Sequence, residues 1–105
     1  MHTLIVRTVL VVFALPPKTP QPVANRFVQK LYGQDATTRG GSYRYRKAGL
    51  LDEIPHRKLR PGVLVLRESD LERLRSFLRA WNVEVEVRVV RPTAEDRRAL
   101  TTARH

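Results

Sequence analysis

Apolar and polar positions alternate along the chain in patterns that predict strands and helices. Residues 3–15 are almost continuously apolar and rich in β-branched side chains, which is typical of a strand covered on at least one face. Residues 62–67 repeat that pattern, and residues 83–91 alternate valine with charged residues, as in a half-buried strand. Apolar residues at spacings of three and four predict helices over about 20–32 and 69–81.

The middle of the chain is more polar, and its pattern is weaker. Residues 33–41 are small, polar and glycine-rich, which predicts a loop. Residues 42–47 predict a strand with two tyrosines on one face and two arginines on the other. We expect residues 48–62 to form a structured loop with one helical turn around 50–54, because Pro55 and Pro61 interrupt any longer helix.

The predicted order of elements, β-α-β-β-α-β, favours an α+β fold in a single domain spanning residues 1–105. Its common solution is a ferredoxin-like plait, in which two helices cover one face of a four-stranded antiparallel sheet. The strands at 3–15 and 62–67 would be central, and those at 42–47 and 83–91 would form the edges. A short C-terminal helix from Ala94 to about Leu100 and a frayed tail over 101–105 would follow.

The charge of the chain indicates a polyanionic partner. There are 20 lysines and arginines against 10 acids among 105 residues, which gives a formal net charge of +10. Sixteen of the basic residues are arginines, whose planar guanidinium suits phosphate contacts and base stacking. Residues 39–62 carry seven basic residues and two acids, so this basic loop and edge strand is the predicted working surface.

Several classes of protein are disfavoured by the sequence. There is no cysteine and there are only three histidines, so we predict no metal and no cofactor. The apolar run from Val9 to Leu15 is seven residues long, whereas a membrane span needs about 20. The N-terminal stretch also lacks the charge order and cleavage site of a secretory signal. We therefore expect a cytoplasmic protein with no membrane partner.

The sequence hypothesis is a small, non-enzymatic nucleic-acid-binding protein. RNA is favoured over DNA, within a ribonucleoprotein such as the ribosome. Tyrosines on the predicted edge strand would stack on bases, and basic side chains would contact phosphates. The predicted binding residues are Arg39, Tyr43, Arg44, Tyr45, Arg46, Lys47, His56, Arg57, Lys58 and Arg60.

Two alternatives stay open at this point. Asp52, Glu53 and His56 lie within five residues and carry the groups needed for general-base chemistry or for a divalent ion. They would serve a metal-dependent nuclease built on the same fold. The other alternative is a protein-interaction module that forms a homodimer through an edge strand, with its charge serving solubility only.

Overall fold

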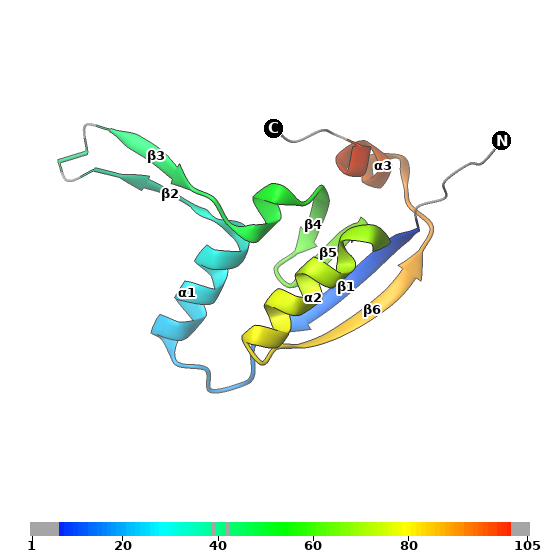
Figure 1. Cartoon of the computed structure of the whole chain (residues 1–105), viewed down its shortest axis with the longest axis horizontal. Helices are drawn as coiled ribbons and strands as arrows, with labels where there is room; N and C mark the ends of the chain where they lie inside the picture. The colour runs from blue at the N-terminus through cyan, green and yellow to red at the C-terminus, as the bar shows by residue number, and fades with distance from the viewer. Residues whose placement is uncertain (1–6, 39, 42, 102–105) are drawn as a thin grey trace.

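The computed structural model describes residues 7–38, 40–41 and 43–101. Over these residues the chain forms a mixed α+β structure (Figure 1). No helix in the described ranges is long and apolar enough to cross a membrane. The elements in chain order are β1 (Thr8–Ala14), α1 (Gln21–Tyr32), β2 (Gln34–Thr37), β3 (Arg44–Lys47), the 3₁₀ turn η1 (Leu50–Glu53), β4 (His56–Arg60), β5 (Val63–Arg67), the 3₁₀ turn η2 (Glu68–Asp70), α2 (Leu71–Ala80), β6 (Glu84–Val90) and α3 (Ala94–Thr101).

Four of the strands form one antiparallel sheet in the order β4-β5-β1-β6. The arrangement is consistent with the predicted ferredoxin-like plait. The strands predicted to be central, β1 and β5, are central, and β6 is an edge as expected. The predicted helical turn around residues 50–54 is also present as η1.

The prediction for the other edge of the sheet is wrong. Within the predicted edge strand, Arg44–Lys47 forms β3, which does not join this sheet, and residue 42 lies outside the described residues. Strand β4 takes the expected place, within a stretch predicted to be a loop. Pro55 and Pro61, which interrupt any longer helix, flank β4. Gly62, with a φ of 79°, makes the tight turn into β5, and its carbonyl accepts a hydrogen bond from the Phe13 amide at 2.9 Å. Only one of the five residues of β4 is apolar, so the hydrophobic pattern could not reveal it.

A second two-stranded sheet, the β2–β3 hairpin, replaces the predicted loop and edge strand. Gln34–Thr37 pairs antiparallel with Arg44–Lys47 in continuous register, from Gln34 opposite Lys47 to Thr37 opposite Arg44. Figure 1 shows that the hairpin projects away from the four-stranded sheet, beyond the end of α1. Residues 34–37 were wrongly predicted to belong to a loop, because the polar residues of β2 carry no strand-like hydrophobic alternation.

The core lies between one face of the four-stranded sheet and helices α1 and α2. Alternate residues of β1 and β5 point into it, and leucines of α2 pack against them. The ring of Phe27 on α1 lies 6.2 Å from that of Phe13 and 5.6 Å from that of Trp81. Residues with a positive φ end both helices: Gly33 follows α1 with a φ of 80°, and Asn82 follows α2 with a φ of 57°.

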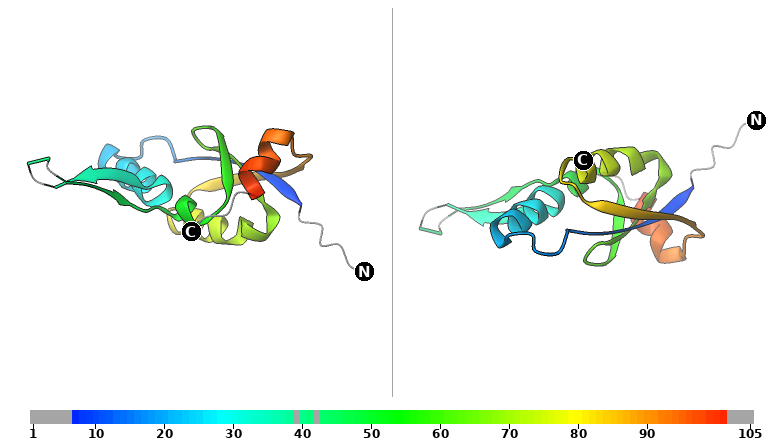
Figure 2. Two further views of the ribbon diagram at one scale, coloured as in Figure 1. Left: turned by 90° about the horizontal axis from the view of Figure 1, so that it is seen from above. Right: turned by 90° about the horizontal axis from the view of Figure 1, so that it is seen from below.

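Helix α3 lies on the opposite face of the sheet from α2 (Figure 2). Thr93 and Asp96 form a capping box: the Thr93 Oγ1 accepts the Asp96 amide at 3.1 Å, and Asp96 Oδ2 accepts the Thr93 amide at 2.9 Å. Asp96 Oδ1 also accepts a hydrogen bond from Arg57 of β4 at 2.7 Å. One buried carboxylate therefore caps α3 and fixes it to the sheet.

The pKa of Asp96 predicts how this attachment depends on pH. The Thr93 amide, followed by Arg57, lowers the pKa of Asp96 below its ordinary value, against the opposing effect of burial. Asp96 has a lower pKa in the folded chain than in the unfolded chain, where it is about 3.9. The ionised carboxylate therefore stabilises the fold fully above that unfolded-state pKa, and this stabilisation is lost as the pH falls through the folded-state pKa. We expect Asp96→Asn to lower the free energy of unfolding by about 1–2 kcal/mol at neutral pH. Urea unfolding at several pH values measures this.

The matched control is Glu95→Gln, which changes an exposed neighbour in the same helical turn and should have little effect. The stability of Asp96→Asn should approach that of the wild type in acid, where both side chains are neutral. A loss of the same size at neutral and acid pH would show that the charge of Asp96 does not hold α3.

Candidate nucleic-acid interface

The β2–β3 hairpin presents two aromatic rings to solvent. Tyr43 and Tyr45 are two residues apart and lie on the same face, as the sequence predicted. Their ring centroids are 6.1 Å apart with an angle of 17° between the planes. Tyr43 is 62% exposed and Tyr45 is 38% exposed, so neither ring belongs to the core. Large exposed aromatic side chains in a parallel arrangement form a surface on which planar ligands can stack.

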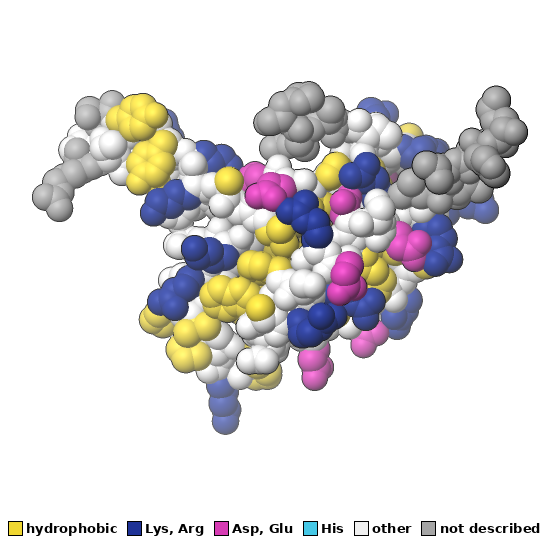
Figure 3. Space-filling model, viewed as in Figure 1, with side chains coloured by type: hydrophobic (Ala, Val, Ile, Leu, Met, Phe, Trp, Pro, Cys, Tyr) yellow, Lys and Arg dark blue, Asp and Glu magenta, His cyan; other side chains and the backbone are white. Residues whose placement is uncertain are grey.

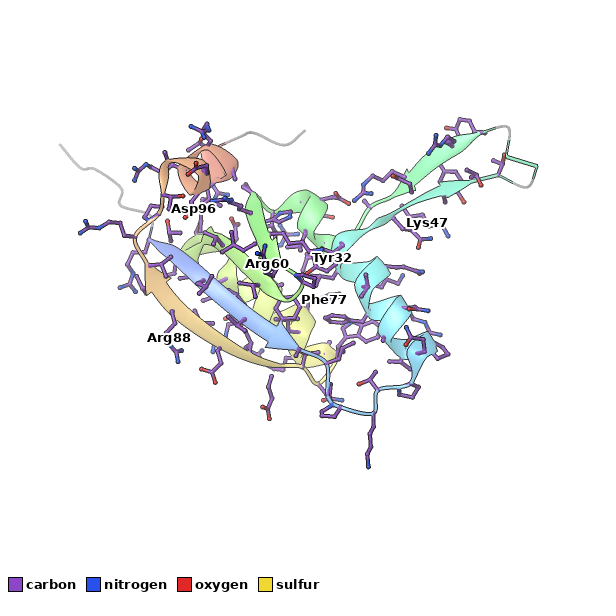
Figure 4. The ribbon with its side chains drawn as sticks, turned by 180° about the vertical axis from the view of Figure 1, so that it is seen from behind. Tyr32, Lys47, Arg60, Phe77, Arg88 and Asp96 are labelled. Carbon is purple, nitrogen blue, oxygen red and sulfur yellow. The ribbon has the colours of Figure 1, made fainter. Side chains whose placement is uncertain are left out.

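Basic side chains lie beside these rings. Lys47 continues the tyrosine face by the strand alternation, and Arg44 lies between the two tyrosines on the reverse face. Both are exposed, and neither forms an ion pair with another described residue. Figure 4 places Lys47 on the hairpin, apart from the sheet. Arg39, another predicted phosphate contact, lies outside the described residues.

The tip of the hairpin is closed by Thr38. Its amide donates to the Tyr43 carbonyl at 2.8 Å, and its hydroxyl accepts the Tyr43 amide at 3.2 Å. The Gly41 amide donates to the Thr38 carbonyl at 2.8 Å. Gly40 and Gly41 have φ values of 89° and 73°, which few other residues adopt readily. These hydrogen bonds join the two strands of the hairpin at the position of Tyr43.

The base of the hairpin is organised by Arg46. One guanidinium nitrogen donates to both Asp52 carboxylate oxygens at 2.9 Å and to the Tyr32 carbonyl at 2.7 Å. The other terminal nitrogen reaches Asp35, the cross-strand partner of Arg46, at 3.3 Å. The hydrogen-bonded Asp52 carboxylate is the main cause that raises the pKa of Arg46 above its ordinary value. This side chain therefore joins β3, β2, the end of α1 and η1.

Two glycines allow these segments to meet. The backbones of Gly33 and Gly49 approach so closely that a Cβ at Gly49 would overlap the Gly33 nitrogen, and would lie 2.7 Å from the Leu31 carbonyl oxygen. A Cβ at Gly33 would lie 2.7 Å from both the Arg46 guanidinium and the Asp52 carboxylate. The Gly49 amide donates to Asp52 at 2.8 Å. Glycine at both positions therefore permits the Arg46 contacts that hold the hairpin.

Ion pairs divide the molecule into two electrostatic regions. Among the described residues, eight acids pair with arginines. Seven of these acids lie on or beside the four-stranded sheet, α2, α3 and η1. They are Asp52, Glu53, Glu68, Asp70, Glu72, Glu86 and Asp96. In contrast, α1 contains no acid, and its Arg26 and Lys30 are exposed four residues apart. Figure 3 shows lysine and arginine along the hairpin and α1, whereas acidic and basic side chains are mixed over the rest of the visible face.

The predicted binding residues of β4 are dispersed. Arg57 pairs with Asp96 on the α3 side of the sheet, whereas the ammonium of Lys58 lies 4.3 Å from the centre of the Tyr32 ring, beside α1. Arg60 is exposed and donates to its neighbouring Leu59 carbonyl at 2.9 Å. The His56 Nδ1 donates to the Ile54 carbonyl at 2.7 Å. These residues therefore do not form one continuous phosphate-binding surface.

The structure gives Asp52, Glu53 and His56 separate partners. Asp52 binds Arg46, Glu53 binds Arg73 of α2 at 2.5 Å, and His56 binds the backbone. In the parts of the chain that the structure describes, no group of three or more histidine and acidic side chains could hold a metal ion. The contacts of these three residues are those of structural side chains.

The contribution of α1 and the segment before it to this basic region was not predicted from the sequence. Lys18, Arg26 and Lys30 precede the hairpin and are exposed without an ion-pair partner among the described residues. A signal was present, because residues 15–34 contain three basic residues and no acid. The prediction concentrated on the denser charge of residues 39–62, where two of the arginines, Arg46 and Arg57, form internal ion pairs.

Comparison of the chain with protein-family models, with curated protein sequences and with solved structures gives no match. The functional interpretation therefore depends on the hairpin, its charge and its attachment to the body.

The attachment predicts that Arg46→Met loosens the hairpin while the sheet stays folded. The variant loses the charged hydrogen bonds to Asp52 and the hydrogen bond to the Tyr32 carbonyl, so hairpin amides should exchange at least severalfold faster in hydrogen–deuterium exchange. Amides of β1 and β5 should keep their protection. The control is Arg44→Met, which removes an arginine from the same strand without breaking an ion pair. If the hairpin amides exchanged equally fast in both variants, Arg46 would not be the residue that holds the hairpin.

Proposed function

We propose that this chain is a small non-enzymatic protein that binds nucleic acid, with RNA the favoured target, through the β2–β3 hairpin and the basic side of α1. The observation that carries the proposal is the pair of exposed, nearly parallel tyrosine rings beside Arg44 and Lys47. These two cations are exposed and form no ion pair with another described residue. Lys58 and Arg60 share both properties, but they lie on β4 and not beside the rings.

Each part of this surface has a distinct role in the proposal. Tyr43 and Tyr45 stack on successive bases, an interaction that tolerates any base because every base has a π-face. Arg44 and Lys47 contact phosphates next to the stacked bases, and Arg26 and Lys30 extend the positive surface along α1. Arg46 and Arg57 stabilise the scaffold and do not contact the ligand, because their guanidinium groups are engaged by acids.

Single-stranded or looped RNA fits this surface best. Stacking on tyrosine needs unpaired bases, which RNA offers in loops, bulges and ends. The hairpin is only two strands wide and projects from the body, so it can enter a folded RNA or a ribonucleoprotein such as the ribosome (Figure 1). Duplex DNA presents phosphates to this surface but no unstacked bases. The chain should therefore bind duplex DNA more weakly than single-stranded RNA, and only through electrostatic attraction.

We further infer that the scaffold is a ferredoxin-like plait with the β2–β3 hairpin inserted between α1 and the second strand of the sheet. The order β4-β5-β1-β6, with β1 and β5 central and all neighbours antiparallel, supports this assignment. The plait hosts many unrelated functions, so the functional proposal depends on the hairpin and not on the fold.

Removing the two hairpin cations should weaken binding and flatten its dependence on salt. For single-stranded RNA, the slope of log K against log salt should fall by roughly 0.7 for each phosphate that Arg44→Ala/Lys47→Ala no longer neutralises. Fluorescence anisotropy over a salt series measures the slope. The control is Arg75→Ala/Arg91→Ala, which removes two exposed cations elsewhere. The proposal would be contradicted if the salt slope of Arg44→Ala/Lys47→Ala equalled that of the wild type. It would also be contradicted if the control variant lowered the slope by the same amount.

Removing the rings should weaken binding without changing the salt slope. Tyr43→Ala/Tyr45→Ala should bind single-stranded RNA roughly 30-fold or more weakly than the wild type, because the two base–aromatic stacks contribute about 1–3 kcal/mol each. Tyr43→Phe/Tyr45→Phe keeps the rings and should bind like the wild type.

The RNA used in these binding experiments should remain intact when magnesium is added. Cleavage that needs magnesium would instead favour the nuclease alternative.

A further inference from the structure

The two edges of the four-stranded sheet differ in how they are protected. Strand β4 has an irregular register between Lys58 and Arg60, is flanked by two prolines and packs against α3. Bulges, prolines and covering elements are among the features by which proteins prevent an edge strand from pairing with another chain. This edge is therefore closed to further strands.

Strand β6 has none of these features. It pairs with β1 over seven residues in unbroken register, from Glu84 opposite Ala14 to Val90 opposite Thr8, and contains no proline. No described element pairs with its outer edge, which Figure 1 shows at the border of the molecule. The backbone groups along that edge are available to a strand of the same length.

The sequence of β6, Glu-Val-Glu-Val-Arg-Val-Val, is complementary to itself when two copies run antiparallel about Val87. Glu86 then lies opposite Arg88 of the second copy, and Arg88 opposite Glu86. Within one chain, a carboxylate oxygen of Glu86 already lies 3.2 Å from a guanidinium nitrogen of Arg88. The side chain of Glu86 is 72% exposed and that of Arg88 is 68% exposed. Pairing would complete a cluster of four alternating charges. Figure 4 shows Arg88 pointing outward from β6, away from the body.

The other symmetric registers bring like charges together or, with the axis at Val89 or Val90, pair no more than three residues of β6. A two-fold axis at Glu86 places that residue opposite itself, and an axis at Arg88 does the same for the arginine. An axis at Val85 sets Glu84 against Glu86. Like charges directly opposite on a sheet are destabilising, so the charge pattern selects the register centred on Val87.

The helix-side face of β6 supports the same register. Val85, Val87 and Val89 point toward that face, where the first two pack against the core and Val89 is left 56% exposed. In the register centred on Val87, Val89 lies opposite Val85 of the second copy, and Val87 lies opposite itself. The same pairing therefore covers the exposed side chain of Val89 and places opposite charges next to each other. Cross-strand pairs of β-branched residues such as valine also stabilise a sheet.

We propose that β6 is a homodimerisation strand, and that two copies of this chain join their sheets into one antiparallel sheet of eight strands. The two-fold axis passes through Val87 perpendicular to the sheet, so α1 and α2 of both copies remain on one face. The interface lies on the sheet edge and includes no residue of the hairpin. The inference does not depend on nucleic-acid binding, and protein alone is enough to test it.

Charge reversal and its rescue test the register directly. Sedimentation equilibrium across the micromolar range should find concentration-dependent dimers of the wild type. Glu86→Arg alone and Arg88→Glu alone should each weaken the dimer at least about tenfold, because each change sets like charges opposite one another at two symmetric positions. The double variant Glu86→Arg/Arg88→Glu restores opposite charges and should return to the wild-type affinity.

The control for added positive charge is Glu95→Arg on α3, which makes the same change of charge as Glu86→Arg outside the interface and should dimerise normally. Circular dichroism should be the same for all variants, because the changed side chains are exposed. A monomeric wild type would overturn the proposal. Dimers that both single variants leave intact, or that the double variant fails to restore, would overturn it as well.

Discussion

The position of the β2–β3 hairpin depends on one guanidinium group. An isolated two-stranded hairpin is at best marginally stable in water, so its direction must come from contacts at its base. Arg46 supplies them by binding Asp35 within the hairpin, Asp52 on η1 and the carbonyl that ends α1. Gly33 and Gly49 let these backbones approach closely enough for a single side chain to reach all three. The hairpin is therefore a directed arm, and the tyrosines it carries have a defined place relative to α1.

Arginine serves two purposes in this chain. Around the sheet, α2 and α3, arginines neutralise most of the acids in internal ion pairs, and the contact of Arg57 with Asp96 fixes α3 to the sheet. Along the hairpin and α1, no comparable number of acids is present, and exposed cations such as Lys30 and Lys47 have no ion-pair partner among the described residues. Exposed ion pairs add little stability, but they determine which part of the surface remains positive.

The parts of the fold with strong hydrophobic periodicity could be predicted from sequence, and the polar parts could not. Strands β1, β5 and β6 and helices α1 and α2 bury a regular stripe, which the pattern of apolar positions reveals. Strand β4 pairs through its backbone while carrying mostly charged residues, and β2 has no apolar face to detect. Sequence identified Tyr43 and Tyr45 as partners on one face. It could not tell that Arg46 is engaged internally while Arg44 is not, because Asp52 and Asp35 approach Arg46 only in three dimensions.

The central claim is that the hairpin arm is the nucleic-acid-binding surface. The most direct test is to follow backbone amide signals by nuclear magnetic resonance as single-stranded RNA is added to the chain. The account predicts that shifts concentrate on β3 and its turn, around Tyr43 and Tyr45, and extend to Arg26 and Lys30 on α1. Shifts confined to the β1 and β5 strands of the sheet, with the hairpin signals unchanged, would contradict it.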